Sequence, residues 1–328
     1  MVRKIKNKKV NSDTIEFNKK IREMKKTHSI KECLWEDKET CEGKIVSAHS
    51  IQNNRFLNMI SKNGKILTFD TEIDEGIKYI FKEKGRKTFS TFTGFCQKHD
   101  KELFQPIEDT NYTSTREQKY LFAFRSLARD FHTKKETLSA NSSLLKKYGM
   151  NPIIMKIVTN HITDLEEISK EFKTMSNQIK DKTYKGLKTK EIILTKEYPI
   201  VANSLFIPYY NSKNEDIFED DVYKKIQNGD LGPTIFLNVF PKDGKTFILL
   251  SYFETYEQLL LPFLEDFNSN SEEKISNMII RYCENVAFNP DYIETNFSLK
   301  ERKNILKSFS DNIIFTNIPL NLKINLFR

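Results

Sequence analysis

The stretch KTFSTFTGFCQKHDKELF, residues 87–104, holds Cys96 and His99 with two residues between them, near the expected start of a helix. Such a pair is conspicuous because the 328-residue chain has only four cysteines and five histidines. A thiolate and an imidazole at this spacing can reach one metal ion from a single turn of backbone, and structural zinc sites are usually built from two such pairs. The stretch therefore predicts half of a metal site.

The other half of the site is expected in ECLWEDKETCEGKIVSAHSIQ, residues 32–52. Cys33 and Cys41 lie there with seven residues between them, which is more than the roughly two to four of common zinc motifs. Together with Cys96 and His99 they would complete a tetrahedral Cys3His set for structural Zn²⁺. The alternative is that these cysteines are ordinary buried thiols.

The composition is that of a soluble globular protein with one large domain or two. Hydrophobic residues make up 38% of the chain and charged residues 30%, and no apolar run reaches the roughly 20 residues of a membrane-spanning helix. The basic N-terminus lacks the apolar segment of a signal peptide. We therefore expect a cytoplasmic protein with no membrane partner and with reduced thiols. The abundance of Lys, Asn and Ile is typical of bacteria with A/T-rich genomes.

The net charge of +8 is confined to the N-terminal end of the chain. Residues 1–31 contain eleven Lys or Arg and three Asp or Glu, whereas residues 32–328 contain 42 of each kind. A basic arm attracts DNA or RNA backbones through a salt-sensitive interaction that does not depend on sequence. The alternative is a solvated tail that keeps the protein soluble. The first basic cluster of the arm consists of Arg3, Lys4, Lys6, Lys8 and Lys9.

The succession of patterns predicts an α+β fold in four parts. These are a basic arm over residues 1–31, a treble-clef-like zinc module over 32–110, a helical region over 111–188, and an α+β domain with a mixed or antiparallel sheet over 189–328. The zinc module is small and polar, so a bound metal would have a role in its folding.

Within the zinc module, GKIVSAHSI at 43–51 predicts a strand. QNNRFLNMISKNGKIL at 52–67 predicts a short helix, a turn at Asn63-Gly64 and a second strand. A further helix should begin near Gly94 and end before Pro106.

The helical region should begin with a cap at Ser114 or Thr115, and helices should continue to Lys180 with a break at 149–152. NQIKDKTYKGLKTK, residues 177–190, predicts a connector between domains. The apolar face of the first long helix is expected to consist of Leu121, Phe124, Leu127, Ala128 and Phe131.

The last part of the chain predicts strands followed by helices. PIVANSLFIPYY at 199–210 predicts one strand, and TIFLNVFPKDGKTFILLSYF at 234–253 predicts a hairpin that turns at residues 241–244. EEKISNMIIRYCENVAF at 272–288 predicts a helix that ends near Asn289, with Cys283 packed on its apolar side. A final helix should be capped by Ser298 with Glu301.

The run KIVSAHSIQNN, residues 44–54, lies between the cysteine pair and the helix-starting Cys/His pair. This arrangement resembles the HNH, or ββα-metal, nucleases, whose treble clef carries a hydrolytic histidine at the end of its first strand. The resemblance covers roughly residues 33–108. It implies that His49 is the general base, that Asn53 or Asn54 orients it, and that Asp100 lends a carboxylate to a catalytic Mg²⁺ or Mn²⁺.

One departure from the nuclease pattern concerns the second histidine of that family, a ligand of its catalytic metal. Only His99 could replace it, by leaving the zinc set. The alternative for His49 is a further zinc ligand or a buried, hydrogen-bonded side chain. An HNH-like endonuclease acting in phage defence or on mobile elements is the activity that the resemblance implies.

Arg125, Arg129 and His132 fall on one arc of the expected long helix. Arg125 and His132, with six residues between them, resemble the motif of HEPN-type ribonucleases, which implies metal-independent RNA cleavage by these two side chains. The alternative is the charged flank of an amphipathic helix.

Three hypotheses of function remain. The first is a zinc-binding, nucleic-acid-interacting protein with HNH-like cleavage, and the second is HEPN-like cleavage. The third is a non-enzymatic zinc-stabilised scaffold or sensor that recognises a protein partner through residues 189–328. Nucleotide hydrolysis is not expected, because the chain has ten glycines and no Walker loop.

Overall fold

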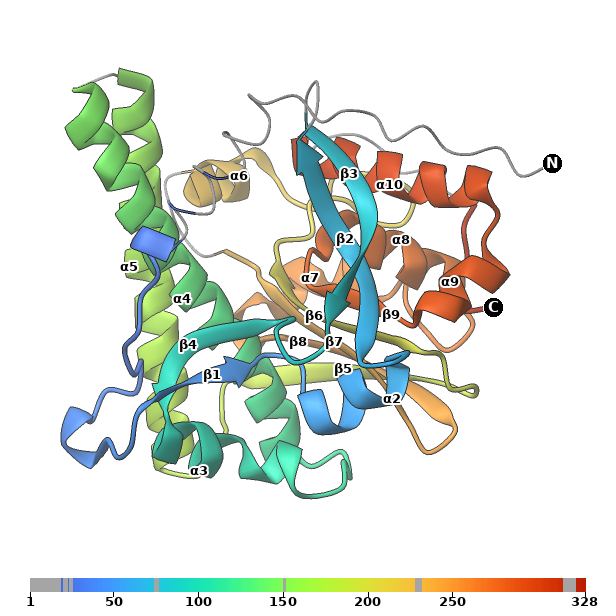
Figure 1. Cartoon of the computed structure of the whole chain (residues 1–328), viewed down its shortest axis with the longest axis horizontal. Helices are drawn as coiled ribbons and strands as arrows, with labels where there is room; N and C mark the ends of the chain where they lie inside the picture. Colours follow the sequence, from blue (N-terminus) through green and yellow to red (C-terminus); the bar gives the residue numbers. More distant parts are fainter. Residues whose placement is uncertain are drawn as a thin grey trace.

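The computed structural model describes residues 19, 23, 26–73, 77–149, 152–227, 232–314 and 323–328. They form a seven-stranded antiparallel sheet, a separate two-stranded sheet and helices on both faces, so the predicted α+β class is confirmed. Figure 1 shows the long helices α4 and α5 along one side and the helices α7 to α10 grouped on the other. The bounds of these helices are α4 Arg116–Tyr148, α5 Pro152–Lys180, α7 Glu257–Leu264, α8 Glu272–Tyr282, α9 Pro290–Asn296 and α10 Leu299–Ile314.

The large sheet combines strands from distant parts of the chain. Its order is β3-β2-β9-β6-β7-β8-β5, and every neighbouring pair is antiparallel. The hairpin β2–β3 belongs to the predicted zinc module, yet Leu67 of β2 pairs with Phe288 of β9. Residues 32–110 and 189–328 therefore contribute to one sheet. The strand bounds are β2 Lys65–Ile73, β3 Ile77–Gly85, β5 Leu187–Leu194, β6 Ile200–Phe206, β7 Ile235–Lys242, β8 Lys245–Phe253 and β9 Val286–Phe288.

The central strands are apolar on both faces because helices cover both. In β7, Phe236 and Phe240 pack into the cluster that contains residues of α4 and α5. Leu237 and Val239, on the opposite face, pack into the cluster that contains residues of α7, α8 and α10. Successive side chains of a strand point to opposite faces, so one strand joins both cores.

The two predicted turns are confirmed. Asn63 and Gly64 have φ angles of 49° and 74°, and the bridge between Lys62 and Lys65 closes this turn. Asp243 and Gly244 have φ angles of 51° and 78°, and they alone join β7 to β8. Two-residue hairpin turns with both φ angles positive match the right-handed twist of the flanking strands.

The long helices also follow the sequence pattern. Thr115 is the N-cap of α4, and its hydroxyl accepts a hydrogen bond of 3.2 Å from the Gln118 N–H. Helix α4 ends at Tyr148 and helix α5 begins at Pro152, as expected. Of the predicted apolar face, Leu121, Phe124, Leu127 and Ala128 are buried and Phe131 packs against them.

The prediction for the helix after Gly94 was wrong at both ends. Helix α3 spans Gln97–Glu108, because residues 91–96 form strand β4 (Thr91–Cys96), which pairs with β1 (Ile45–His49). The helix also runs through Pro106. This proline lies in the last turn, where it removes a single backbone bond, and the Asp109 N–H still donates to the Gln105 carbonyl at 2.9 Å.

Two further boundaries differ from the prediction. Helix α8 ends at Tyr282 rather than near Asn289, because Val286–Phe288 forms β9 between β2 and β6, and Cys283 is a buried residue at the end of the helix. The connector is also shorter than predicted, since α5 continues to Lys180 and β5 begins at Leu187.

The remaining elements are short. They are η1 Lys38–Thr40, η2 Asn53–Leu57, α2 Asn58–Ile60, α6 Asp220–Gln227 and η3 Glu254–Tyr256. The expected cap of α10 is confirmed, since the Ser298 hydroxyl accepts from the Glu301 N–H while the Glu301 carboxylate accepts from the Ser298 N–H. Over the described ranges, no helix is long and apolar enough to span a membrane.

Candidate metal centre

Four side chains from the two predicted half-sites converge at the start of α3. Cys33 precedes η1, Cys41 follows it, Cys96 is the N-cap of α3, and His99 lies in the first turn of that helix. Their ligand atoms all lie within 4.8 Å of one another. In the part of the chain that the structure describes, no other group of three or more His, Cys, Asp or Glu side chains is close enough to share an ion.

The distances between the nitrogen and the sulfurs of the group fit tetrahedral coordination of one metal ion. The Nδ1 atom of His99 lies 3.3 Å from the sulfurs of Cys33 and Cys96 and 3.6 Å from that of Cys41. Metal–ligand bonds of about 2.3 Å to sulfur and about 2.1 Å to nitrogen, at tetrahedral angles, separate such atoms by roughly 3.6 Å. The three distances from Nδ1 to the sulfurs are therefore close to those of tetrahedral zinc coordination.

Thr40 fixes the tautomer of the His99 ring. The Thr40 hydroxyl donates to the Asp37 carbonyl at 2.8 Å, so its oxygen is left to accept from the Nε2–H of His99 at 3.1 Å. A proton on Nε2 leaves Nδ1, the nitrogen facing the three sulfurs, free to bind a metal. The Trp35 ring packs against the imidazole with its centroid 5.7 Å away and further limits its rotation.

Backbone hydrogen bonds align the loop around Cys41 with the start of α3. The Gln97 N–H donates to the Lys44 carbonyl at 2.9 Å, and the Lys98 N–H donates to the Glu42 carbonyl at 3.3 Å. Gly43 allows this approach, because its φ is +74° and an added Cβ would lie 3.0 Å from the Cβ of Gln97. These contacts place Cys41 beside Cys96 at the start of α3.

The pKa values of the cysteines and the histidine in this group favour the binding of a cation. Burial, followed by the neighbouring Cys33 and Cys96, raises the pKa of Cys41 to about 12. Burial also acts to raise the pKa of Cys96, but backbone N–H groups of His99 and Glu42 outweigh it and leave that pKa below its usual value. Burial lowers the pKa of His99, which favours the neutral ring that binds metals. Three crowded thiols can all ionise only beside a positive ion.

The residues matched to the nuclease pattern lie outside this group. His49 ends β1, and its Nε2 atom is buried without a hydrogen-bond partner among the described residues. Asp100 lies in α3, and its Oδ1 atom is buried in the same way. Asn53 begins η2, where its Oδ1 accepts from Arg86 at 2.7 Å, while the neighbouring Asn54 is exposed.

One ion pair influences both His49 and Asp100. Burial and then Arg125 lower the pKa of His49, whereas burial raises the pKa of Asp100 against the effect of Arg125. Arg125 itself is 2% exposed, pairs with Glu108 at the end of α3, and lies over the Phe104 ring at 4.2 Å. The Arg125–Glu108 pair therefore acts electrostatically on both His49 and Asp100.

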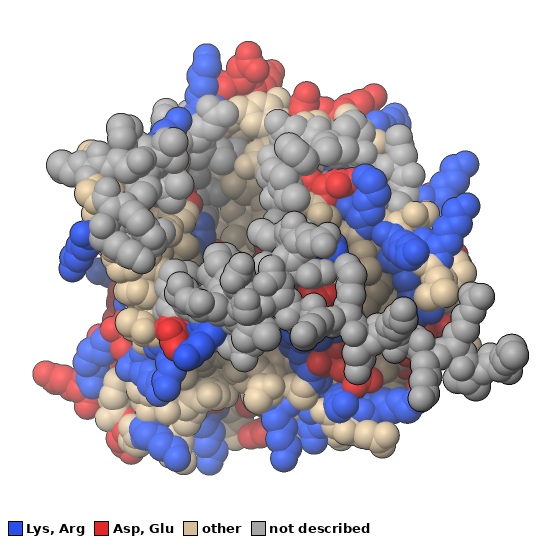
Figure 2. Space-filling view, turned by 45° about the horizontal axis from the view of Figure 1, so that its top comes forward, with Lys and Arg blue, Asp and Glu red and all other residues tan. Residues whose placement is uncertain are grey.

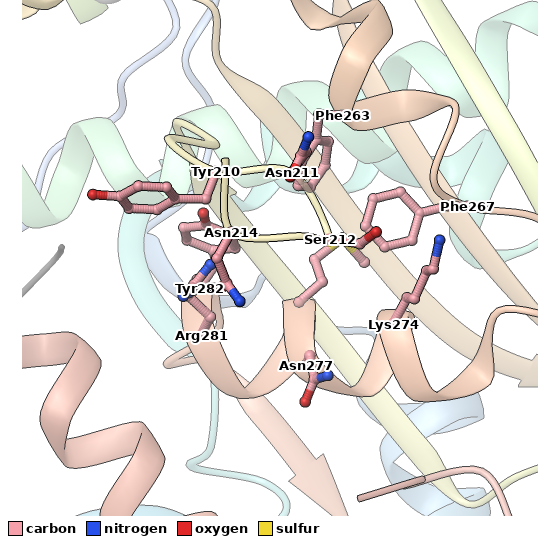
Figure 3. A pocket seen from close by; sticks show the side chains of 11 residues that line it. Tyr210, Asn211, Ser212, Asn214, Phe263, Phe267, Lys274, Asn277, Arg281 and Tyr282 are labelled. Carbon is pink, nitrogen blue, oxygen red and sulfur yellow. Dashed lines mark hydrogen bonds between the residues drawn. The ribbon is translucent and has the colours of Figure 1, made fainter. Parts of the chain in front are cut away.

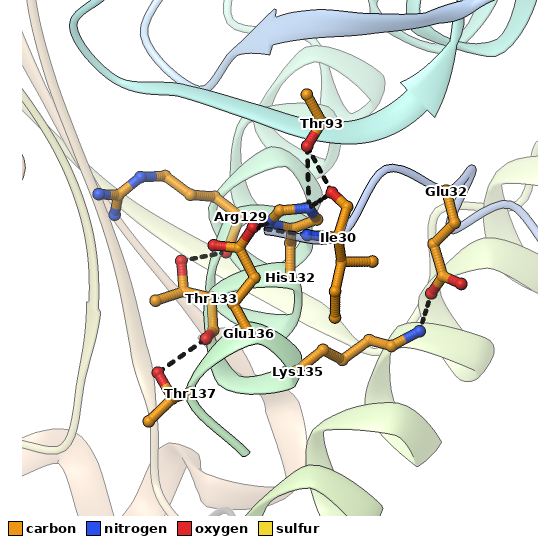
Figure 4. A network of polar contacts seen from close by, with 9 residues as sticks. All are labelled: Ile30, Glu32, Thr93, Arg129, His132, Thr133, Lys135, Glu136 and Thr137. Carbon is orange, nitrogen blue, oxygen red and sulfur yellow. Dashed lines mark hydrogen bonds and ion pairs between the residues drawn. The ribbon is translucent and has the colours of Figure 1, made fainter. Parts of the chain in front are cut away.

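The two residues matched to the ribonuclease pattern, Arg125 and His132, have different partners. Arg125 forms an ion pair with Glu108. His132 is buried, and its Nε2 donates to the Ile30 carbonyl at 3.0 Å. Figure 4 shows the Arg129 side chain extending away from the ring of His132. The structure gives His132 a structural contact with the segment before Cys33.

The segment before Cys33 is bonded to side chains of α4. The Ile30 N–H donates to the Glu136 carboxylate at 3.0 Å, and the side chains of Glu32 and Lys135 form an ion pair (Figure 4). The arm residues Arg3, Lys4, Lys6, Lys8 and Lys9 lie outside the described residues.

Buried polar residues that were not predicted from the sequence attach the metal unit, meaning the predicted zinc module of residues 32–110, to the large sheet. The Ser50 and Ser90 hydroxyls lie 2.5 Å apart, and the Asn285 amide donates to them at 3.1 and 2.9 Å. Asn285 directly precedes β9, so the network joins the two sheets. No sequence signal pairs residues about 200 positions apart, and Thr40 likewise gave no signal beyond its place next to Cys41.

Comparison with protein-family models, curated proteins and solved structures gives no match for this chain. The function must therefore be inferred from the residues of the site and the charge of the chain.

Proposed function

We propose that the chain is a zinc-stabilised protein that binds nucleic acid through its basic N-terminal arm. The observation that carries this proposal is the connection between the two features. All of the net charge of +8 lies in residues 1–31, and Cys33, the first ligand of the metal group, follows this arm directly. The metal unit would thus anchor the arm to the folded body.

Zinc is the ion that suits this donor set best. Three thiolates and one imidazole are soft and borderline ligands, which favour Zn²⁺ over Mg²⁺ or Ca²⁺. Four protein ligands complete a tetrahedron and leave no position for water or substrate, so the role is structural. Such a site requires reduced thiols, as in the cytosol.

Metal content tests the first half of the proposal. We expect about one zinc per chain in the wild type and loss of that zinc in Cys96→Ser, measured by elemental analysis after identical purification. Cys283→Ser is the matched control, because Cys283 is buried far from the group in sequence and is not one of its members. A wild type without zinc, or equal losses in both variants, would contradict the proposal.

The role of the arm follows from the charge distribution. Figure 2 shows acidic and basic side chains interspersed on the face drawn, which gives the folded body no dominant sign there. Neutralising Arg3, Lys4, Lys6, Lys8 and Lys9 with Gln should weaken DNA or RNA binding and reduce the slope of log affinity against log salt by about 0.7 to 0.9 per lost phosphate contact.

A control with the same change of charge separates the arm from net charge. Neutralising five exposed lysines of the body should have a much smaller effect on the salt slope than neutralising the arm. Equal slopes for the two variants would show that the arm is not the binding element. The five lysines are Lys101, Lys173, Lys185, Lys245 and Lys300.

Phosphodiester cleavage is a second candidate, favoured by buried atoms of His49 and Asp100 that have no hydrogen-bond partner among the described residues. If His49 is the general base, His49→Ala should abolish cleavage with added Mg²⁺ or Mn²⁺ while the zinc content stays unchanged. His161→Ala, on α5 beside Asn141, is the control. Wild-type protein that binds nucleic acid but never cleaves it would leave binding, or a scaffold role, as the function.

A further inference from the structure

A pocket lies where the metal unit meets the turn of the β7–β8 hairpin. Its cavity has a volume of about 350 Å³, or about 800 Å³ with the open solvent at its mouth. This is within the roughly 300 to 1,000 Å³ of small-ligand sites. The pocket in Figure 3, between the loop after β6 and α8, has a cavity of only about 40 Å³, which has room for water alone. Of the two, only the larger pocket can admit a ligand.

The floor of the larger pocket is apolar and rigid. Phe56 and Tyr112 line it and are 5% and 7% exposed. Both rings contact the Phe240 ring behind them, with centroids 4.7 and 5.1 Å away. Ile107 and Pro241 complete the floor and are buried. Such a floor can cover an aliphatic side chain, but its rings expose too little surface for a flat ligand to stack on them.

The rim of the pocket carries uncharged amides. Asn54, Asn58 and Asn111 line the pocket and are exposed. The side chains of Asn58 and Asn111 form no hydrogen bond with any described residue. The Oδ1 atom of Asn54 accepts one long bond, of 3.4 Å, from Asn53. Each Asn amide offers two donors and one acceptor oxygen, which match the C=O and N–H groups of a peptide backbone.

The cations of the pocket are engaged within the protein. Arg55 donates to the backbone carbonyls of Asp109 and Thr110. Lys242 forms an ion pair with Asp243. Because neither cation is placed to hold a phosphate, the groups that face a ligand are polar but uncharged.

The rim is also built on an unusual turn. The Leu57 N–H donates to the Gln52 carbonyl, five residues back, at 3.1 Å, so η2 is a π-helical turn. Such turns are rare and occur often at functional sites. Met59 follows the turn and is 49% exposed at the pocket. Its flexible side chain can adapt to the shape of an apolar group.

An aliphatic side chain on an extended peptide matches both the floor and the rim. We propose that the pocket binds such a segment of a partner protein. The aliphatic side chain lies on Phe56 and Ile107, beside Met59. The amides of Asn58 and Asn111 pair with backbone N–H and C=O groups on either side of it, so the backbone supplies affinity and the pocket supplies specificity. The segment is uncharged next to this side chain, because the pocket has no free counter-charge to offer.

This inference goes beyond the proposed nucleic-acid binding and does not depend on the arm. Methyl NMR of the full, metal-loaded chain tests it, because Met59 is one of only seven methionines and its signal is assigned by its loss in Met59→Leu. The probes are short peptides, acetylated and amidated at their ends, with a central Leu, Ile or Met between alanines. At least one should shift the Met59 signal saturably, with a Kd in the millimolar range or tighter. The signal of Met155, which is exposed on α5, should not move.

Two comparisons separate recognition of the backbone from binding of the apolar side chain alone. N-methylation of the backbone amides next to the central residue removes their N–H groups and should weaken binding of the same peptide about tenfold or more. Asn58→Ala and Asn111→Ala should each weaken it about fivefold. Asn160→Ala, at an exposed position of α5, is the matched control and should leave binding unchanged. The N-methylated peptide is tested on the wild type, so this comparison holds even if a variant does not fold.

The proposal is overturned if no peptide of the set shifts the Met59 signal, or if the N-methylated peptide and both asparagine variants bind as tightly as the originals. It is also overturned if a single-stranded oligonucleotide shifts this signal and the peptides do not, since the pocket would then bind nucleic acid. The arm proposal fails separately, when peptides bind the pocket but neutralising the arm leaves the salt slope unchanged.

Discussion

At the scale of single residues, the candidate metal centre includes one threonine besides its four candidate ligands. Thr40 directs the His99 ring because its own proton is committed to the Asp37 carbonyl. Partners of this kind orient a ligand and raise its basicity, and their loss typically costs about 10- to 100-fold in metal affinity. The ligand set alone does not account for the site.

Thr40→Val should therefore weaken zinc binding by about tenfold or more without removing a ligand. Valine keeps the shape of threonine, but it cannot accept a hydrogen bond from the Nε2–H of His99. Competition with a chromogenic chelator measures the affinity. Thr40→Ser keeps the hydroxyl and should stay close to wild type, so equal losses in the two variants would assign the effect to packing instead.

The Arg125–Glu108 ion pair supports a second prediction at this scale. Arg125 is 2% exposed, so Glu108→Gln would leave an almost fully buried guanidinium facing a neutral amide. We expect a loss of about 3 kcal/mol in the free energy of unfolding, the lower end for a broken buried pair, since Glu108 is itself 30% exposed. Denaturant titration measures this loss. Glu273→Gln, at an exposed position of α8, should change little, and comparable losses would argue against the ion pair.

At the scale of elements, two glycines with similar backbone conformations have different surroundings. Gly43 and Gly244 have φ angles of +74° and +78°. A Cβ added at Gly43 would meet the Cβ of Gln97 at 3.0 Å, whereas one added at Gly244 would meet no described atom within 4 Å apart from its chain neighbours. Replacing each glycine by alanine can therefore separate the effect of backbone strain from the effect of displacing the loop that carries Cys41.

Gly43→Ala and Gly244→Ala should each lower the free energy of unfolding by about 1 kcal/mol, because alanine is strained at positive φ. Only Gly43→Ala should also weaken zinc binding, since the contact with Gln97 displaces the loop that carries Cys41. Thermal unfolding and chelator competition measure the two effects. Zinc affinity that falls equally in both variants would refute the proposed role of the loop.

The elements also show what a sequence can predict. Asn63-Gly64 and Asp243-Gly244 identify their turns because the signal is local to two residues. The four members of the candidate metal group could be named because the chain has few thiols and imidazoles to choose from. Strand β9 could not be predicted, since the pairing of Leu67 with Phe288 gives three residues after α8 their extended conformation. Helix α3 was misplaced because Thr91–Cys96 becomes a strand only through its pairing with β1.

At the scale of the whole molecule, the metal unit is part of the main fold. Its hairpin β2–β3 extends the large sheet, and Asn285 bonds to Ser50 and Ser90 across the two sheets. One buried apolar cluster contains Phe95 of β4, Phe124 of α4 and Phe236 of β7. Loss of the metal should therefore affect the stability of the entire body.

Removal of the metal by a chelator should lower the temperature of one cooperative unfolding transition rather than remove a small early one. The shared cluster couples the start of α3 to α4 and to the sheet, so the free energy of metal binding contributes to the stability of all three. Differential scanning calorimetry, with and without the chelator, measures the transition. The Cys96→Ser variant should unfold at the temperature of the chelated wild type and should not respond to the chelator. Two transitions, the upper one unchanged by chelation, would mean instead that the metal unit unfolds independently of the sheet that it extends.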